Sequence, residues 1–96
     1  MHLYNILDKR GGQAPTAAAT AAALEANRLA AEAANELGDK CYNKEENQEA
    51  IQHYSSAITL DGTNYIYYIN RCVTYRRIDS WAYAAADARK VSISSR

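Results

Sequence analysis

Apolar and small residues recur every three or four positions along most of this sequence, which is the spacing of one buried face of an α-helix. The clearest stripe begins after Glu46 or Asn47 and stops at Gly62, a residue typical of helix C-termini. The members of that stripe are Ala50, Ile51, Tyr54, Ala57 and Ile58. No segment alternates with a period of two, as a half-buried strand does. The sequence therefore predicts an all-α fold.

The same spacing predicts three further helices. The helix over residues 30–43 has an apolar stripe made of Ala30, Ala33, Ala34, Leu37 and Cys41. Asn64 is a natural N-cap for a helix that carries Tyr65, Tyr68, Ile69, Cys72, Val73 and Tyr75. After a turn at Asp79–Ser80, the last helix is expected to bury Trp81, Ala84, Ala85, Ala88 and Val91.

The stretch ahead of these helices divides into two parts. Residues 1–15 contain Gly11–Gly12 and Pro15 and are predicted to be a flexible leader, in which Leu3, Tyr4, Ile6 and Leu7 form one apolar patch. Residues 16–30 are rich in alanine and begin at Thr16, a good N-cap. We expect a helical extension that either runs into the next helix or lies over its first turn.

Composition predicts a small domain with a thin core. The chain has 96 residues, and its apolar content depends on nineteen alanines, with eight tyrosines and no phenylalanine. Alanine buries little surface, and a chain of this length buries only about 60–70% of its unfolded surface. The sequence therefore predicts marginal stability or dependence on a partner.

A net charge of zero conceals an electric dipole. Residues 25–61 carry eight acids and three bases, whereas residues 71–96 carry six bases and two acids. The basic end is suited to an acidic segment, and head-to-tail self-association is equally compatible. Nucleic acid is not an expected partner, because the bases lack interleaved stacking aromatics apart from Tyr75.

Targeting signals and cysteine usage indicate a cytoplasmic protein. No apolar run approaches the ~20 residues of a membrane span, and the N-terminus does not resemble a secretory signal. Cys41 and Cys72 lie far apart without a C-x-x-C motif or a Cys/His cluster, which is typical of a reducing compartment. Buried thiols on helix faces are expected, with a disulfide or a metal pair as the alternatives.

Residues suited to catalysis or metal binding do not form a recognisable motif. His2 and His53 have no Ser or Cys partner at a known spacing, and there is no P-loop or G-x-G-x-x-G sequence. Glu45, Glu46 and Glu49 lack the spacing and the glycine of a calcium loop. We therefore expect a non-catalytic chain without a cofactor or a metal.

The four predicted helices form two helix-turn-helix pairs that begin about 34 residues apart, which is a solenoid period. With residue 31 as the first position of a repeat, five residues stand at positions that resemble the pattern of a tetratricopeptide repeat (TPR). They are Leu37, Gly38, Ala50, Tyr54 and Ala57. The segments 37–42, 50–61 and 70–75 resemble the first two repeats of co-chaperone TPR domains. Gly38 and Ala50 are predicted to be the points where paired helices touch. The repeats are assigned to residues 31–64 and 65–96.

This resemblance implies a right-handed α-solenoid fragment whose first helix in each pair lines a concave groove for a partner protein or peptide. The groove residues expected from it are Glu32, Asn35, Asp39, Tyr42, Ile66, Ile69, Asn70, Val73, Arg76 and Arg77. Co-chaperones of this family hold acidic chaperone tails with a two-carboxylate clamp. Here the clamp is incomplete, because its first-repeat lysine and asparagine positions are Asn35 and Asp39, and Asn70 alone matches.

Two functions follow from these expectations. The first is an adaptor whose groove binds a basic and apolar partner segment, with Arg76 and Arg77 either at the groove edge or solvated at a helix end. The second is a structural subunit or fragment of a larger TPR assembly that is stabilised by oligomerisation or by partner packing. Two repeats favour the second reading, since the face after the last helix lacks a polar cover.

Overall fold

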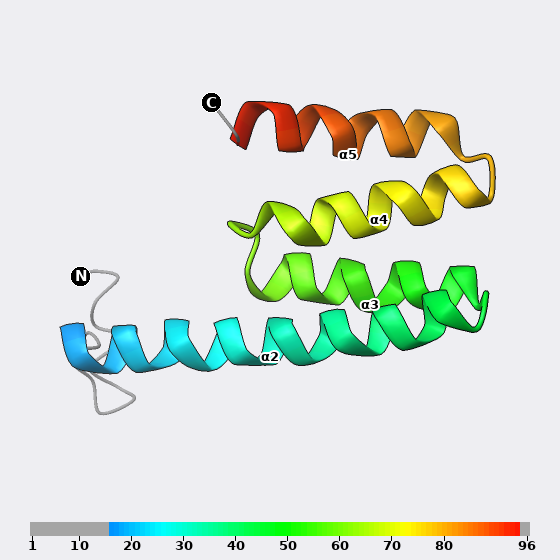
Figure 1. Cartoon of the computed structure of the whole chain (residues 1–96). Helices are drawn as coiled ribbons and strands as arrows, with labels where there is room; N and C mark the ends of the chain where they lie inside the picture. The colour runs from blue at the N-terminus through cyan, green and yellow to red at the C-terminus, as the bar shows by residue number, and fades with distance from the viewer. Residues whose placement is uncertain (1–15, 95–96) are drawn as a thin grey trace, which may run out of the picture.

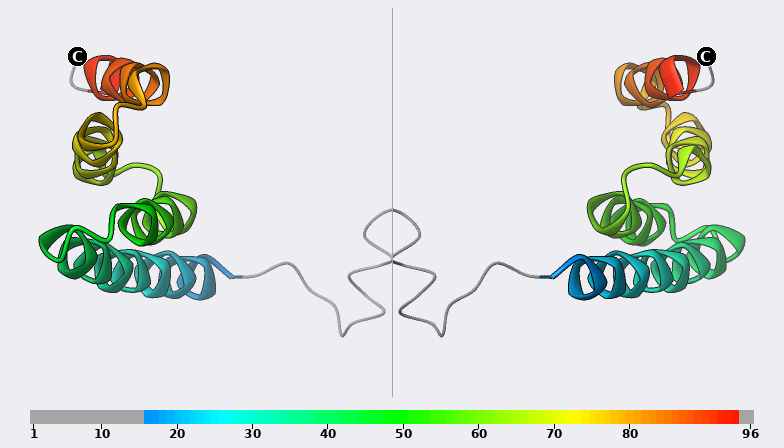
Figure 2. Two further views of the ribbon diagram at one scale, coloured as in Figure 1. Left: turned by 90° about the vertical axis from the view of Figure 1, so that its right-hand side faces the viewer. Right: turned by 90° about the vertical axis from the view of Figure 1, so that its left-hand side faces the viewer.

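The computed structural model describes residues 16–94, which form four α-helices stacked in sequence order (Figure 1). The helices are α2 (Ala17–Asn43), α3 (Asn47–Leu60), α4 (Tyr65–Arg77) and α5 (Trp81–Ser94). Each helix packs on the next one along the chain, as the end-on views of Figure 2 show. The predicted all-α fold of two helix-turn-helix pairs is confirmed. The leader with its apolar patch lies outside the described residues.

The alanine-rich extension runs directly into the next predicted helix, so that α2 is continuous from Ala17 to Asn43. Thr16 caps its start, because the Thr16 Oγ1 accepts a hydrogen bond from the Ala19 N–H at 3.0 Å. Alanine favours the helix, and α2 contains no proline to interrupt it. The first half of α2 projects beyond α3 (Figure 1). Within the described part of the chain, no helix is long and apolar enough to cross a membrane.

The turns inside the two helix pairs have the same backbone geometry. Glu45 and Asp79, which are 34 residues apart, have positive φ values of 62° and 61°. The Glu46 N–H donates to the Cys41 carbonyl at 2.9 Å, and the Ser80 N–H donates to the Tyr75 carbonyl at 2.8 Å. These bonds satisfy the last carbonyls of α2 and α4 in the same way. The repeat is therefore present in the backbone, although the two copies share little sequence.

Gly38 is a contact point between α2 and α3, as predicted. A Cβ atom on Gly38 would lie 2.5 Å from Tyr54 Cε1, well inside van der Waals contact. Ala50 and Ala57, which face α2 from α3, are fully buried. The small residues let the helix axes come together, and the Tyr54 ring covers the space that Gly38 leaves.

The two pairs are joined by the buried ring of Tyr67 on α4. Tyr67 is 2% exposed and forms one cluster with Ala31 and Ala57, against which Ala34 and Ile58 pack. A single aromatic side chain thus connects three helices. This is consistent with the predicted thin core, because Tyr54, Tyr67 and Thr74 are the largest fully buried side chains described.

The predicted buried face of α2 is correct only in part: Ala34 and Cys41 are partly buried as expected, but the centre of the buried face is rotated by about one residue. Ala30, Ala33 and Leu37 are exposed, whereas Ala31 and Gly38 are buried. The reason is that Ala31 and Gly38 permit the closest approach of neighbouring helices, while alanines on every side of α2 leave its apolar stripe poorly defined.

The predicted buried faces of the second pair also need correction. On α4 the buried residues are Tyr67 and Thr74, whereas Tyr65, Ile69 and Val73 are exposed. For Ile69 and Val73 this exposure agrees with their assignment to the groove. On α5 the buried residues are Ala84 and Asp87, whereas Trp81, Ala85 and Ala88 are exposed. Two of the four buried positions are polar, which an apolar stripe does not reveal.

Asp87 is buried because it forms a bidentate ion pair with Arg71 of α4. The Arg71 Nε and Nη2 atoms donate to the two carboxylate oxygens at 2.9 and 2.7 Å, and Nη1 donates to Ser55 Oγ at 3.0 Å. Hydrogen bonding to Asp87 is the main cause that raises the pKa of Arg71. The Arg71 guanidinium also lies near the rings of Tyr68 and Tyr75. This network fastens α5 to the rest of the stack.

We predict that Gly38→Ala destabilises the domain by about 1–2 kcal/mol, because the new methyl group must displace the Tyr54 ring. In a Tyr54→Ala background the same substitution is expected to be neutral or stabilising, since the obstacle is gone and alanine favours a helix. Urea unfolding followed by circular dichroism measures both effects. Equal costs of Gly38→Ala in the two backgrounds would contradict the packing described here.

We also predict that Asp87→Asn costs about 3 kcal/mol, because it leaves the partly buried Arg71 guanidinium without its counter-charge. The matched control is Glu25→Gln, which removes one acid from the exposed pair with Arg28 and should leave stability unchanged. The midpoint of thermal unfolding reports both variants. If Asp87→Asn lowers the midpoint no more than Glu25→Gln does, the network around Arg71 and Asp87 does not stabilise the folded domain.

Candidate binding groove

Side chains from α2 and α4 meet on one face of the stack and surround a hollow of about 170 Å³. The residues that line it are Asp39, Tyr42, Tyr54, Asn70 and Val73. Four of the five belong to the groove expected from the sequence. The fifth, Tyr54, comes from α3 and was predicted only as a member of the apolar stripe of that helix. One sequence feature could have identified Tyr54 as a groove residue: it lies four residues after Ala50, on the same buried face of α3, and its side chain is long.

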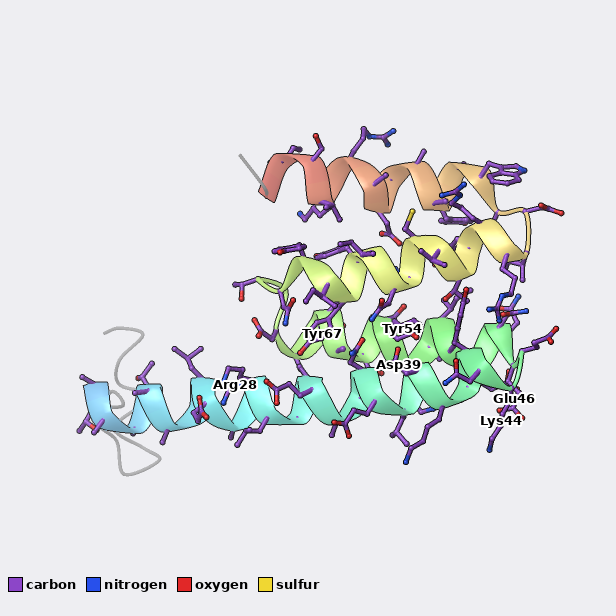
Figure 3. The ribbon with its side chains drawn as sticks, viewed as in Figure 1. Arg28, Asp39, Lys44, Glu46, Tyr54 and Tyr67 are labelled. Atoms are coloured by element: carbon purple, nitrogen blue, oxygen red, sulfur yellow. The ribbon has the colours of Figure 1, made fainter. Side chains whose placement is uncertain are left out.

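Tyr54 and Asp39 are joined by a short hydrogen bond on one side of this hollow. The Tyr54 hydroxyl donates to Asp39 Oδ1 at 2.6 Å, and Figure 3 shows the two labelled side chains close together beside α2. Burial, followed by the hydrogen bond to Asp39, raises the pKa of Tyr54. Because a phenol that keeps its proton remains a donor, the Tyr54 hydroxyl holds the Asp39 side chain in position.

Asn35 and Asn70 form the bridge between the two groove helices. The Asn70 Nδ2 atom donates to Asn35 Oδ1 at 2.9 Å, and both residues are partly buried. The sequence placed both residues in the groove but did not predict that they would bond to each other. This contact fixes the spacing of α2 and α4 and leaves the Asn70 Oδ1 atom as an acceptor and the Asn35 NH2 group as a donor for other partners.

Arg77 is part of the junction between the repeats. Its guanidinium carbon lies 3.4 Å from the centroid of the Tyr42 ring. Its Nη1 atom donates to the Tyr42 carbonyl at 2.8 Å and to Asn47 Oδ1 at 3.1 Å. The expectation that Arg77 is merely solvated at a helix end is therefore wrong. Its contacts hold the end of α2 and the start of α3 against the end of α4.

The remaining predicted groove residues lie elsewhere around this face. Glu32 is exposed and pairs with Arg28 on α2, and Figure 3 shows Arg28 far from Asp39 along that helix. Ile66 is exposed near the start of α4 and does not line the hollow. Ile69 and Arg76 line a separate hollow between α4 and α5. The structure thus brings together only part of the predicted set.

Asp39 supplies the one carboxylate among the residues that line this hollow. Among the residues that the structure describes, no lysine or arginine forms an ion pair with Asp39. Its carboxylate accepts a bond from Tyr54 and has lone pairs left for a further donor. Within residues 16–94, no group of three or more His, Cys, Asp or Glu side chains is placed to hold a metal ion. The described cysteines, Cys41 and Cys72, are free, and burial raises the pKa of Cys41.

Part of this chain is similar in sequence to a known protein. No protein-family model matches the chain. Over 55 residues, which are 57% of the chain, it is 36% identical to Hsp70-Hsp90 organizing protein 1 of Arabidopsis thaliana. The chain spans about 10% of the length of that relative.

A solved structure resembles the chain in three dimensions. The TPR domain of Arabidopsis OM64 superposes with a TM-score of 0.70 at 29% identity, covering 71% of this chain and 56% of that one. The similarity of fold, the repeated turns and the helix contacts at Gly38 and Ala50 lead to one conclusion. The four helices have the fold of a tetratricopeptide-repeat domain.

Proposed function

We propose that this chain is a non-catalytic adaptor that binds a segment of a partner protein in the groove between α2 and α4. TPR domains are typically protein–protein interaction modules and are generally non-catalytic. The observation that carries the proposal is the hollow lined by Asp39, Tyr42, Asn70 and Val73 on the face shared by the two helices. A cytoplasmic location belongs to the proposal and rests on the sequence argument from cysteine usage.

The chemistry of the groove favours a partner segment that is basic and apolar. Asp39 offers an unpaired carboxylate to a lysine or arginine side chain. Along α4, Ile66, Ile69 and Val73 are between 37% and 46% exposed and offer apolar surface beside it. A segment with a basic residue next to large apolar residues satisfies both features.

An acidic chaperone tail is a weaker candidate. The name Hsp70-Hsp90 organizing protein 1 suggests chaperones as partners of a relative. In this chain the residues at the first-repeat clamp positions are Asn35, which is bonded to Asn70, and Asp39. A carboxylate placed beside Asp39 is repelled, because like charges at contact distance in a partly buried site cost several kcal/mol.

A structural role in a larger assembly is the second candidate, and exposed apolar side chains on α5 favour it. Trp81 and Ile93 are 58% and 70% exposed. Surfaces of this kind on a small domain often mark contacts with another chain. An adaptor should remain a monomer with one cooperative unfolding transition, whereas a structural subunit should oligomerise or unfold broadly until its partner is added. Analytical ultracentrifugation combined with thermal unfolding distinguishes the two roles.

We predict that a short fluorescent peptide with two arginines flanking two leucines binds more tightly than a charge-reversed peptide with glutamates in place of the arginines. Asp39→Asn should weaken that binding about tenfold, or about 1.4 kcal/mol, while still accepting the Tyr54 hydrogen bond. Fluorescence anisotropy measures the dissociation constants. Glu49→Gln, which makes the same change of charge on the exposed side of α3, is the control and should have no effect.

Two results would contradict this function. One is equal binding of the arginine peptide to the Asp39→Asn variant and to the unchanged protein. The other is micromolar binding of an acidic peptide with a free C-terminal carboxylate, abolished by Asn70→Ala. That second result would restore the chaperone-tail clamp despite the substitutions at Asn35 and Asp39.

A further inference from the structure

Both ends of the helix stack carry exposed apolar side chains. On α2, the side away from its buried residues carries Leu29, Ala33 and Leu37, which are spaced four residues apart and are all exposed. On α5, Trp81 and Ala85 are exposed, and Figure 1 shows α2 and α5 as the outermost helices of the stack. Each end of the stack therefore offers apolar surface to a further helix.

The repeated backbone places α2 and α4 in equivalent positions. Each is the first helix of its pair, and the turns that follow the two helices have the same geometry. The buried residues of α4 are Tyr67 and Thr74, and the residues 34 positions earlier on α2 are the exposed Ala33 and Lys40. The exposed side of α2 is therefore the same side by which α4 packs on the first pair.

The sizes of the side chains suit an α2 helix on the second pair. Within the chain, the large Tyr67 of α4 packs with the small Ala31 and Ala57. The residues 34 positions after those alanines are Tyr65, which is 47% exposed, and Val91. Because the covered face is the large one here, the covering helix must supply a small residue, and α2 has an alanine at the position equivalent to Tyr67.

The hollow of about 250 Å³ between α4 and α5 indicates which charges the covering helix needs. Three of its lining residues, Val73, Arg76 and Ala88, stand 34 positions after residues of the hollow beside Asp39. Two residues of α4 complete the hollow beside Asp39, and their equivalents on α2 are Glu36 and Asp39. Arg76 is exposed, and no carboxylate among the described residues forms an ion pair with it. An α2 helix on the second pair therefore brings two carboxylates to the hollow that contains Arg76.

We propose that the face formed by α4 and α5 binds the exposed side of α2 from a second copy of this chain, so that copies stack head to tail. In the stack, Ala33 of the second copy lies against Tyr65 and Val91, and Glu36 of the second copy pairs with Arg76. The hollow between α4 and α5 is then completed by residues of both copies, as α4 completes the hollow of the first pair. The acidic half of one copy faces the basic half of the next.

The inference rests on the second candidate function, a structural role in a larger assembly, and specifies its contact. A contact made by one helix is smaller than a standard protein interface, and Lys40 of the second copy must keep its ammonium group in water at the edge. We expect a dissociation constant on the order of 100 µM. The chain is then a monomer at low micromolar concentrations, where the peptide experiment tests the groove at Asp39 without the stack.

Sedimentation equilibrium of the intact chain between about 10 µM and about 1 mM tests the stack. The average mass should rise steadily with concentration, since a head-to-tail contact does not close on itself as a dimer does. Glu36→Arg and Arg76→Glu should each weaken the association about fivefold or more, because each brings like charges together. An equimolar mixture of the two variants should restore most of it, since each carries the charge that the other lacks. Glu49→Arg, on the exposed side of α3, is the control and should have no effect.

A change of size tests the same contact independently of charge. Ala33→Tyr should weaken the association about tenfold, because its ring meets Tyr65 of the other copy. Tyr65→Ala in the same chain should restore it, since a tyrosine then packs on small residues as Tyr67 does within the chain. Both residues are exposed, and circular dichroism checks that the fold is kept. Ala86→Tyr, at an exposed residue on the other side of α5, should have no effect.

Two outcomes would overturn the proposal. A chain that stays monomeric at about 1 mM does not form this contact, and a structural role would then require a different protein as the partner. Association that the charge variants leave unchanged, or that their mixture does not restore, lies at another surface. In that case the structural role stands, and the pairing of α2 with the face of α4 and α5 is wrong.

Discussion

The close approach of α2 and α3 at Gly38 is the contact on which the rest of the structure depends. Because Gly38 has no side chain, the Tyr54 ring lies directly on the backbone of α2. That position brings the Tyr54 hydroxyl to 2.6 Å from Asp39 Oδ1 and fixes one wall of the groove. The packing of the first helix pair therefore also determines where Asp39 lies. A larger side chain at Gly38 would displace Tyr54, and the displaced Tyr54 would no longer hold Asp39 in the groove.

The second helix pair keeps the backbone of the first and stabilises it with different side chains. Its turn at Asp79 repeats the geometry of Glu45, but its helices are joined by the ion pair of Arg71 with Asp87. An ion pair fixes the relative position of α4 and α5 without filling the space between them. A hollow lined by Cys72 and Ala88 lies between α4 and α5, at the positions where the first pair has Gly38 and Tyr54. Equivalent backbone positions consequently give the two repeats different surfaces.

The sequence predicts the number and order of the helices correctly, but it does not predict correctly which face of each helix is buried. Caps such as Thr16 and Asn64 act locally, so their residue types identify the helix starts. The buried face of α2 was misassigned because alanine on all sides gives a weak stripe, and the burial of Asp87 was missed because its partner Arg71 lies on another helix. The groove was predicted in part, through the positions of Asp39 and Asn70. The bond of Asn70 to Asn35 depends on the distance between two helices, which no local pattern encodes.

The most direct test of the central contact is a proton NMR measurement of Gly38 in the intact chain. If the Tyr54 ring lies on the glycine, the Gly38 α-protons should show strong nuclear Overhauser effects to the Tyr54 ring protons and a clear upfield ring-current shift. Gly38 α-protons with ordinary helical shifts and no Overhauser effect to Tyr54 would contradict the account, because neither the helix contact nor the position of Asp39 would then have its stated cause.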